Sequence, residues 1–298
     1  MKKIILFTLL YLGITATYAQ DKMPTPVEIR QAIAADIKSL NVAPEPVANV
    51  SNEVVLNGKD SIPIRIYSPN KKVLPVIYLI HGGAMVAGDL DTHDNICRYL
   101  ANHAEATVIA VHYRRPPEHK FPAAFNDSYA VLKWISNDMK KFKNNNKLIL
   151  LGDSAGGQLA AAVALANAKE KQPIAIAAQV LINPALDVSK ESPTYAAYPF
   201  MVEWYINKTD DPKDNRLSPL QAASVKGVPP ALIVVCEKDE LRSEGEAYHK
   251  KLTDAGIASK LYMQPNAGHL GGYWCAASDK AKPSMDFVVT ELIRVLKK

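Results

Sequence analysis

Cysteine is scarce in this chain of 298 residues, which contains three: Cys97, Cys236 and Cys275. So small and odd a set supports neither a disulfide framework nor a cysteine-rich metal site, and it allows at most one bridge. An excess of one charge is also lacking, because 35 Lys and Arg stand against 30 Asp and Glu, a formal net charge of +5. Without a basic run or interleaved aromatic residues, this balance argues against nucleic acid as a partner.

A run of apolar residues long enough to span a bilayer is missing as well. Two lysines at residues 2–3 precede a short apolar stretch at 4–14, and Thr-Tyr-Ala at 17–19 has the small residues of a cleavage site. The stretch is too short for a spanning helix, so no stable membrane insertion is expected. We interpret residues 1–19 as a signal peptide, with a retained anchor as the alternative, and expect a periplasmic or secreted protein.

The chain does contain apolar runs that alternate with helical stretches. The runs predict strands buried on both faces, at residues 74–80, 106–111, 147–151, 174–182 and 231–235. Helical spacing predicts helices at residues 24–40, 94–103, 123–136, 155–168, 244–255 and 283–295. This alternation predicts an α/β fold: a mostly parallel, twisted sheet with helices on both faces and functional groups at the carboxyl ends of its strands.

One of the predicted strands leads directly into a Gly-x-Ser-x-Gly motif. Gly-Asp-Ser-Ala-Gly at residues 152–156 follows the strand and opens an Ala-rich helix, which is the context of the nucleophile elbow in the α/β-hydrolase fold. The strained turn would expose the Ser154 hydroxyl, and the helix N-terminus would leave the Ala155 amide free to stabilise an oxyanion. Ser154 is therefore the predicted nucleophile; the alternative is a turn that only packs a helix against a strand.

A second part of an oxyanion hole is expected in an earlier loop. His81-Gly82-Gly83-Ala84 follows the strand at 74–80, and its glycines would let backbone amides approach a substrate oxygen. His81 precedes the nucleophile, which is the wrong order for the base of this fold, so we interpret it as a loop-stabilising residue.

The general base is expected late in the chain, because the order in this fold is serine, acid, histidine. Two histidines follow Ser154. His249 falls within a predicted helix, whereas His269 lies in a loop after a short predicted strand at 260–264. The sequence therefore predicts His269 as the base.

The acid is expected between the nucleophile and the base. Asp239 lies just beyond the strand at 231–235, where its carboxylate could orient the imidazole and stabilise the imidazolium. Asp187, which follows the preceding strand, and Glu237 are the rival candidates.

These motifs resemble the hormone-sensitive lipase-like family of bacterial esterases, over nearly all of the chain from residue 74 onward. The family's motifs His-Gly-Gly-Gly, Tyr-Arg-x-x-Pro-Glu, Gly-Asp-Ser-Ala-Gly-Gly and Asp-Pro-Leu-Arg-Asp-Glu are similar to residues 81–84, 113–118, 152–157 and 239–244. The last motif departs at two positions and keeps Asp239. Ala84 replaces the third loop glycine, a change that we expect to adjust the acyl pocket.

The resemblance implies acyl transfer at Ser154 without a metal or organic cofactor. The amides of Gly82, Gly83 and Ala155 would hold the oxyanion, and His269 would protonate the departing alcohol. Carboxylic esters of short-chain acids are the expected small-molecule substrates.

The resemblance also implies how the chain is organised. Residues 20–298 would form a single α/β-hydrolase domain, with lid (cap) elements at about 24–48 and 189–223. Family members often form dimers through the sheet edge near the C-terminus, so a homodimer is one option for this chain.

Other functions of a protein with this fold and this triad stay open. Triad chemistry does not separate esters from amides, so an amidase or peptidase is one alternative, and a carbohydrate deacetylase is another. A non-catalytic ligand-binding homologue is the third, because the family includes a plant hormone receptor without the catalytic histidine. The presence of His269 argues against that reading.

Overall fold

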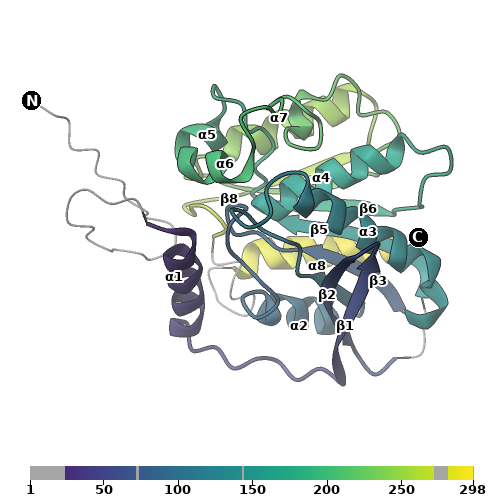
Figure 1. The fold of residues 1–298 in the computed structure, drawn as a ribbon. Coiled ribbons are helices and arrows are strands. Elements are labelled where there is room, and N and C mark those ends of the chain that lie inside the picture. The colour runs from purple at the N-terminus through teal and green to yellow at the C-terminus, as the bar shows by residue number, and fades with distance from the viewer. Residues whose placement is uncertain (1–23, 72–73, 143, 272–280, 298) are drawn as a thin grey trace, which may run out of the picture.

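The computed structural model describes residues 24–71, 74–142, 144–271 and 281–297. Within these residues one eight-stranded sheet has the strand order β1-β2-β4-β3-β5-β6-β7-β8 (Figure 1). The strands are β1 (Asn49–Asn57), β2 (Asp60–Ser68), β3 (Leu74–Ile80), β4 (Thr107–Val111), β5 (Asn144–Asp153), β6 (Ala178–Ile182), β7 (Ala231–Cys236) and β8 (Ser259–Gln264). The expected α/β-hydrolase architecture, with a mostly parallel sheet, is confirmed.

Strand direction differs between one edge of the sheet and the rest. β1 pairs antiparallel with β2, and β2 pairs antiparallel with β4. From β4 through β3 and β5 to β8 all neighbouring strands are parallel. The carboxyl ends of these parallel strands meet at one side of the sheet, which is where ligands bind in open α/β sheets.

Helices cover both faces of the sheet, as expected. Figure 1 shows α2 and α8 on the opposite side of the sheet from α4 and α7. One apolar cluster joins the sheet to α3 (Ala123–Asn137), α4 (Ala155–Ala168) and α7 (Arg242–Asp254). A second cluster joins the other face to α2 (Asp94–His103) and α8 (Lys282–Lys297). The buried strands are continuous apolar runs because helices exclude water from both of their faces.

A third, smaller apolar cluster joins segments that are far apart in the sequence. Ile29 and Ile33 of α1 (Pro26–Ser39) pack with Val86 and Ala87 of the loop after β3 and with Met201 of α6 (Pro199–Tyr205). The short helix α5 (Pro193–Ala197) precedes α6, and both lie on the same side of the molecule as α1 in Figure 1. The two segments expected to form a lid therefore meet above the loop that follows β3.

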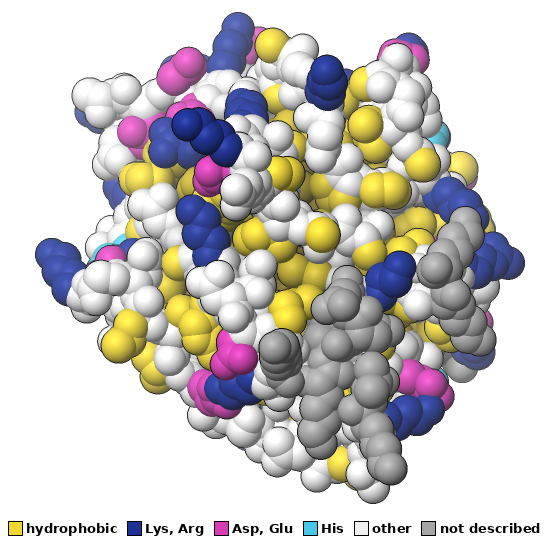
Figure 2. All heavy atoms as spheres, turned by 90° about the vertical axis from the view of Figure 1, so that its right-hand side faces the viewer, with side chains coloured by type: hydrophobic (Ala, Val, Ile, Leu, Met, Phe, Trp, Pro, Cys, Tyr) yellow, Lys and Arg dark blue, Asp and Glu magenta, His cyan; other side chains and the backbone are white. Residues whose placement is uncertain are grey.

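Charged side chains of both signs lie on the surface of the molecule (Figure 2). On the face in Figure 2, Lys and Arg side chains are scattered, with acidic side chains beside several of them, and do not form one basic surface.

Cys97 and Cys236 are both buried free thiols, whereas Cys275 and the predicted signal peptide lie outside the described residues. Within the described part of the chain, no helix combines the length and apolarity needed to cross a bilayer.

Candidate active site

The serine of the elbow lies between β5 and α4, as the sequence predicts. Its backbone has φ 49° and ψ −118°, a left-handed conformation that is strained for a residue with a side chain. A Cβ at Gly156 would lie 2.0 Å from the Ile80 carbonyl oxygen, so glycine is required where the new helix passes the neighbouring strand. The turn therefore fixes the position of Ser154 at the carboxyl edge of the sheet.

Ser154, His269 and Asp239 form one hydrogen-bonded chain. His269 Nε2 is 2.9 Å from Ser154 Oγ, and His269 Nδ1 is 3.0 Å and 3.1 Å from the two carboxylate oxygens of Asp239. These distances lie within the reach of proton transfer. Two further donors hold the carboxylate, because Asn183 Nδ2 donates to Oδ2 at 2.6 Å and the Leu241 amide donates to Oδ1 at 3.0 Å. The carboxylate favours the tautomer with hydrogen on Nδ1, which leaves Nε2 free to accept the serine proton.

The pKa shifts of His269 and Asp239 favour the charged forms of both side chains. Burial disfavours the charged imidazole, but the nearby Asp239 carboxylate outweighs it and raises the pKa of His269 above its usual 6.5. Burial likewise disfavours the carboxylate, while His269 and the donors to Asp239 hold its pKa below 3.8. The arrangement thus stabilises the imidazolium that forms when a serine hydroxyl gives up its proton.

The rival candidates are engaged elsewhere. Asp187 accepts hydrogen bonds from the Ser189 amide and from Gln221. Glu237 accepts from the Asn266 amide at 2.6 Å and so supports the loop that carries His269. His249 bonds to the hydroxyl of Ser259 at 2.8 Å.

His81 is buried in the loop after β3 and has its own partner. Its Nδ1 is 2.8 Å from the Gly82 carbonyl oxygen, and burial holds its pKa well below the usual value. The ring stacks on Tyr113 with 4.2 Å between ring centroids. These contacts fit the loop-stabilising interpretation of His81.

The loop after β3 requires one correction to the predicted oxyanion hole. The Gly82 amide donates to Asp153 Oδ1 at 3.0 Å, so this hydrogen already has a buried carboxylate acceptor and is not available for a substrate oxyanion. The prediction of Gly82 as a donor is therefore wrong. By contrast, no described residue accepts a hydrogen bond from the amides of Gly83, Ala84 or Ala155.

The carboxylate that engages Gly82 belongs to a buried group whose role the sequence did not predict. Asp153 is fully buried beside Ser154, and His93 Nε2 lies 3.1 Å from Asp153 Oδ1. The His93 ring is buried too, with Thr92 Oγ1 at 3.1 Å from its Nδ1. Asp153 therefore links the elbow to the loop after β3. Its position between the glycine and the serine of the motif was the only signal that pointed to it.

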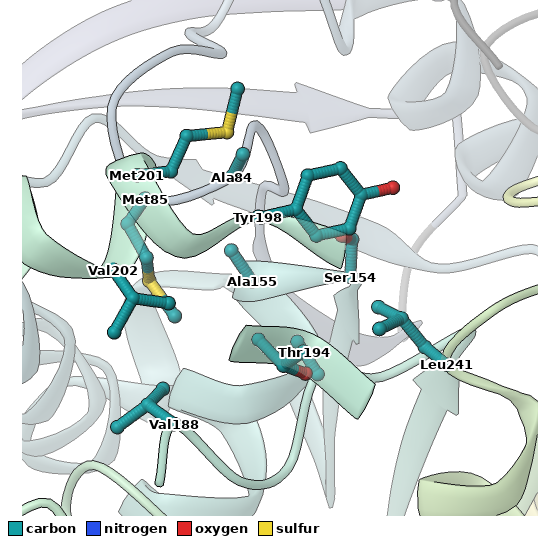
Figure 3. Close-up of a pocket in the computed structure, with 11 residues that line it drawn as sticks. Ala84, Met85, Ser154, Ala155, Val188, Thr194, Tyr198, Met201, Val202 and Leu241 are labelled. Carbon is teal, nitrogen blue, oxygen red and sulfur yellow. The ribbon is translucent and has the colours of Figure 1, made fainter. Parts of the chain in front are cut away.

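A small apolar cavity opens beside Ser154. Its volume is about 30 Å³, room for about two water molecules at the roughly 10–15 Å³ that one needs. Figure 3 shows Ser154 and Tyr198 on one side of it, and Val202 and Val188 on the opposite side. The remaining lining residues are Ala84, Met85, Ala155, Ala185, Thr194, Met201 and Leu241.

The tyrosines between residues 195 and 205 have separate roles. Tyr198 lines the cavity, with its ring centroid 6.3 Å from that of His269. Tyr205 is fully buried and meets the Phe121 ring edge-on. Tyr195 instead donates its hydroxyl to Glu203. Tyr198 thus reaches the cavity, whereas Tyr205 packs in the core.

A second residue missed in the sequence holds the wall of the cavity. The buried carboxylate of Glu244, on α7, accepts hydrogen bonds from the amides of Leu186 and Asp187 and from both the amide and hydroxyl of Thr194. Burial raises the pKa of Glu244 to about 7, while its donors at Thr194 and Leu186 act in the opposite direction. Glu244 therefore fixes the segment that carries Val188 and Thr194 into the cavity.

Comparison with known proteins supports the fold and the class of reaction. A family profile described as alpha/beta hydrolase fold matches residues 76–271. Carboxylesterase NlhH of Mycobacterium tuberculosis is 32% identical over 256 residues, covering 79% of this chain and 80% of that protein. Ethyl acetate hydrolase of Pseudomonas putida is 32% identical over 225 residues, covering 70% and 71%.

A solved esterase structure also has the same fold as this chain. The hyperthermophilic esterase from the archaeon Pyrobaculum calidifontis superposes with a TM-score of 0.86 at 28% identity, covering 94% of both chains. The family profile spans more than half of the present chain, and carboxylesterase NlhH aligns over about four fifths of it. The chain therefore belongs to the α/β-hydrolase family and, within it, to the hormone-sensitive lipase-like group of carboxylic ester hydrolases.

Proposed function

We propose that Ser154, His269 and Asp239 carry out ester hydrolysis in this protein, on esters of short-chain carboxylic acids. The observation that carries the proposal is the continuous contact from Ser154 Oγ through His269 to Asp239, with separations of 2.9 Å and 3.0 Å. A serine activated by a histidine that a carboxylate orients is the arrangement used for nucleophilic acyl transfer.

In the proposed reaction His269 moves one proton in each direction. Ser154 Oγ attacks the ester carbonyl carbon as its proton passes to His269 Nε2, and the carbonyl oxygen becomes an oxyanion. The imidazolium, stabilised by Asp239, then donates its proton to the departing alcohol, which leaves an acyl-serine. Water repeats these steps, releases the carboxylic acid and restores the serine.

The amides of Gly83, Ala84 and Ala155 are proposed to hold the oxyanion. The Ala155 amide lies at the start of α4, where it has no acceptor within the helix. The side chain at position 84 does not enter this role, because alanine and glycine present the same backbone hydrogen. Loss of one such donor typically lowers the rate about a hundredfold to a thousandfold.

The preference for short acyl groups rests on the cavity. Its lining is apolar apart from Ser154, Thr194 and the Tyr198 hydroxyl, and its volume is small, at about 30 Å³. Apolar walls favour a hydrocarbon acyl chain, and the volume limits its length. Polar partners for a sugar ring are few, which argues against a carbohydrate deacetylase.

The test uses nitrophenyl esters from acetyl to palmitoyl, with a Ser154→Ala variant as the control. We expect turnover to be greatest with short chains and to fall by several orders of magnitude in the variant, with unchanged circular dichroism. Matched nitroanilides of the same acids separate ester from amide cleavage. Retained turnover in folded Ser154→Ala would refute the proposed nucleophile, and faster anilide cleavage would favour the amidase reading.

Export and a lid complete the proposal. The charged, apolar and small-residue pattern of residues 1–19 supports cleavage after Ala19 and a periplasmic or secreted enzyme. The contact of α1 with α6 supports a lid formed by the segments 24–48 and 189–223. N-terminal sequencing of the protein recovered outside the cytoplasm is expected to begin at Gln20; a start at Met1 would refute the cleavage.

A further inference from the structure

A second cavity has a charged lining and shares no residue with the cavity at Ser154. Its volume is about 230 Å³. It lies between α1 and the segment that follows β4. Its charged and titratable lining residues include Arg30, His112, Arg114, Arg115, Glu118 and His119.

Two of its three arginines have carboxylate partners. Arg30 makes a two-pronged contact with Glu118, with nitrogen to oxygen distances of 2.8 Å and 2.7 Å. Arg114 makes a similar contact with Asp127 at 2.9 Å and 2.8 Å, and a further ion pair with Asp60. The single acidic side chain that lines the cavity is therefore already committed to Arg30.

Arg115 differs from both neighbours. No carboxylate in the described part of the chain lies within ion-pair distance of it, and its one strong acceptor is the Gly88 carbonyl oxygen. The side chain is partly buried, and this burial lowers the pKa of its guanidinium. A guanidinium has five N–H donors in a fixed fork, so most of the hydrogen-bonding capacity of Arg115 is unused.

His112, beside Arg115, is also incompletely satisfied. Its Nε2 lies 3.5 Å from the Arg115 guanidinium, while its Nδ1 is buried and has no hydrogen-bond partner among the described residues. Buried polar atoms without partners are uncommon in folded proteins and call for an explanation. A guanidinium without a direct ion pair and a histidine with an unpaired ring nitrogen thus line the same cavity.

We propose that this cavity binds a small oxyanion, a carboxylate or a phosphate, between Arg115 and His112. A planar guanidinium matches two oxygens of such a group at once, and an imidazole N–H can donate to a third position. His119 lines the same cavity and adds a further donor. Carboxylate partners largely neutralise the charges of Arg30 and Arg114, so these two side chains attract an anion less strongly than Arg115 does. Arg115 is therefore the residue expected to bind the anion.

The position of this site gives it access to the loop that follows β3. Arg115 contacts the Gly88 carbonyl, and Arg30 Nε donates to the Val86 carbonyl at 2.7 Å. Both carbonyls belong to the same loop as Gly83 and Ala84. An anion bound to Arg115 would therefore contact a side chain that holds this loop, and its binding does not depend on the proposed oxyanion hole.

The test is calorimetric titration of the full-length folded protein with inorganic phosphate and, separately, with acetate, at constant ionic strength set by sodium chloride. We expect one saturable site for at least one of the two anions. Arg115→Gln is expected to weaken binding at least tenfold. Arg242→Gln is the matched control, because Arg242 pairs with Glu246 on α7 and does not line the cavity.

A second variant guards against a folding defect in Arg115→Gln. His112→Asn leaves the contact of Arg115 with Gly88 in place and is expected to weaken binding severalfold. Binding of phosphate alone identifies a phosphate site, and binding of acetate alone identifies a carboxylate site. Absence of saturable binding of both anions, or equal affinities in the wild type and in both variants, would overturn the proposal.

Discussion

Replacement of Asp239 by asparagine removes one charge from the proposed triad and leaves its shape nearly unchanged. His269 Nδ1 contacts both carboxylate oxygens, at 3.0 Å and 3.1 Å. Asn183 and the Leu241 amide each donate to one of those oxygens. In the variant, the new NH₂ group must face one of these donors, and the imidazolium loses its counter-ion.

The size of the effect follows from the charge. Two unit charges about 4 Å apart attract by about 4 kcal/mol at an effective dielectric constant near 20. Because about 1.4 kcal/mol corresponds to a factor of ten, the loss of this attraction in the transition state predicts a fall in kcat of about a thousandfold. The change should leave KM nearly unaltered, since Asp239 does not line the acyl cavity.

The pH profile is expected to move in a defined direction. The neutral form of His269 is the active base, so kcat/KM falls as the pH drops through its pKa. Asp239 raises that pKa against the opposing effect of burial, and the wild-type midpoint therefore lies above 6.5. Without this carboxylate, burial outweighs the smaller opposing effects of Asp153 and Glu240, so the midpoint in Asp239→Asn shifts to lower pH.

The assay is nitrophenyl acetate hydrolysis from pH 5 to 9, with Asp187→Asn as the matched control. Asp187 is the rival carboxylate, and its described partners are the Ser189 amide and Gln221 rather than a histidine. We expect Asp187→Asn to keep the wild-type midpoint. A fall of less than tenfold in folded Asp239→Asn, or an unchanged midpoint, would refute the assigned role of Asp239.

Three further substitutions test the surroundings of the triad. A methyl group in Gly82→Ala would lie 2.3 Å from Asp153 Oδ2, so we expect kcat for nitrophenyl acetate to fall at least a hundredfold; an unaltered kcat in folded protein would contradict this reading of the loop. Ala84→Gly removes a methyl group from the cavity wall, and the butyrate-to-acetate ratio of kcat/KM should rise about fourfold, the value of one buried CH₂; a falling ratio would disagree. In Glu244→Gln the new NH₂ group must face either the Thr194 amide or the amides of Leu186 and Asp187, which should lower the free energy of unfolding by about 2–4 kcal/mol in urea; an unchanged urea midpoint would exclude this.

The main elements of the fold could be predicted because their signals are local. The strand β5, the elbow and the helix α4 follow one another without a gap, and the helix bounds Ala155–Ala168 and Asp94–His103 match the spacing of apolar residues. By contrast, β1 was missed. It is an edge strand with one fully buried residue, Val55, so its sequence has no continuous apolar run.

Other elements differ because tertiary packing decides where they end. The apolar run at 174–182 yields a strand only from Ala178, since β5 pairs with β6 from that residue onward. The helix α7 begins at Arg242, two residues before its predicted start. The bond between Gly82 and Asp153 joins residues 71 positions apart, so no local pattern could show that the Gly82 amide is already engaged.

Ala84 shows how this protein accommodates a departure from the family's loop. Both Ala84 and Met85 have positive φ angles, 50° and 68°, a conformation that costs residues with a Cβ about 1–2 kcal/mol each. Hydrogen bonds to charged groups contribute about 1.5–3 kcal/mol each, and the loop receives two, from Arg30 to the Val86 carbonyl and from Arg115 to the Gly88 carbonyl. The cost of the two positive φ angles and the contribution of the two hydrogen bonds are of similar size. The hydrogen bonds from Arg30 and Arg115 can therefore offset the backbone strain that glycine would have avoided. The departure at position 84 and the charged cavity behind the loop are therefore coupled features of this chain.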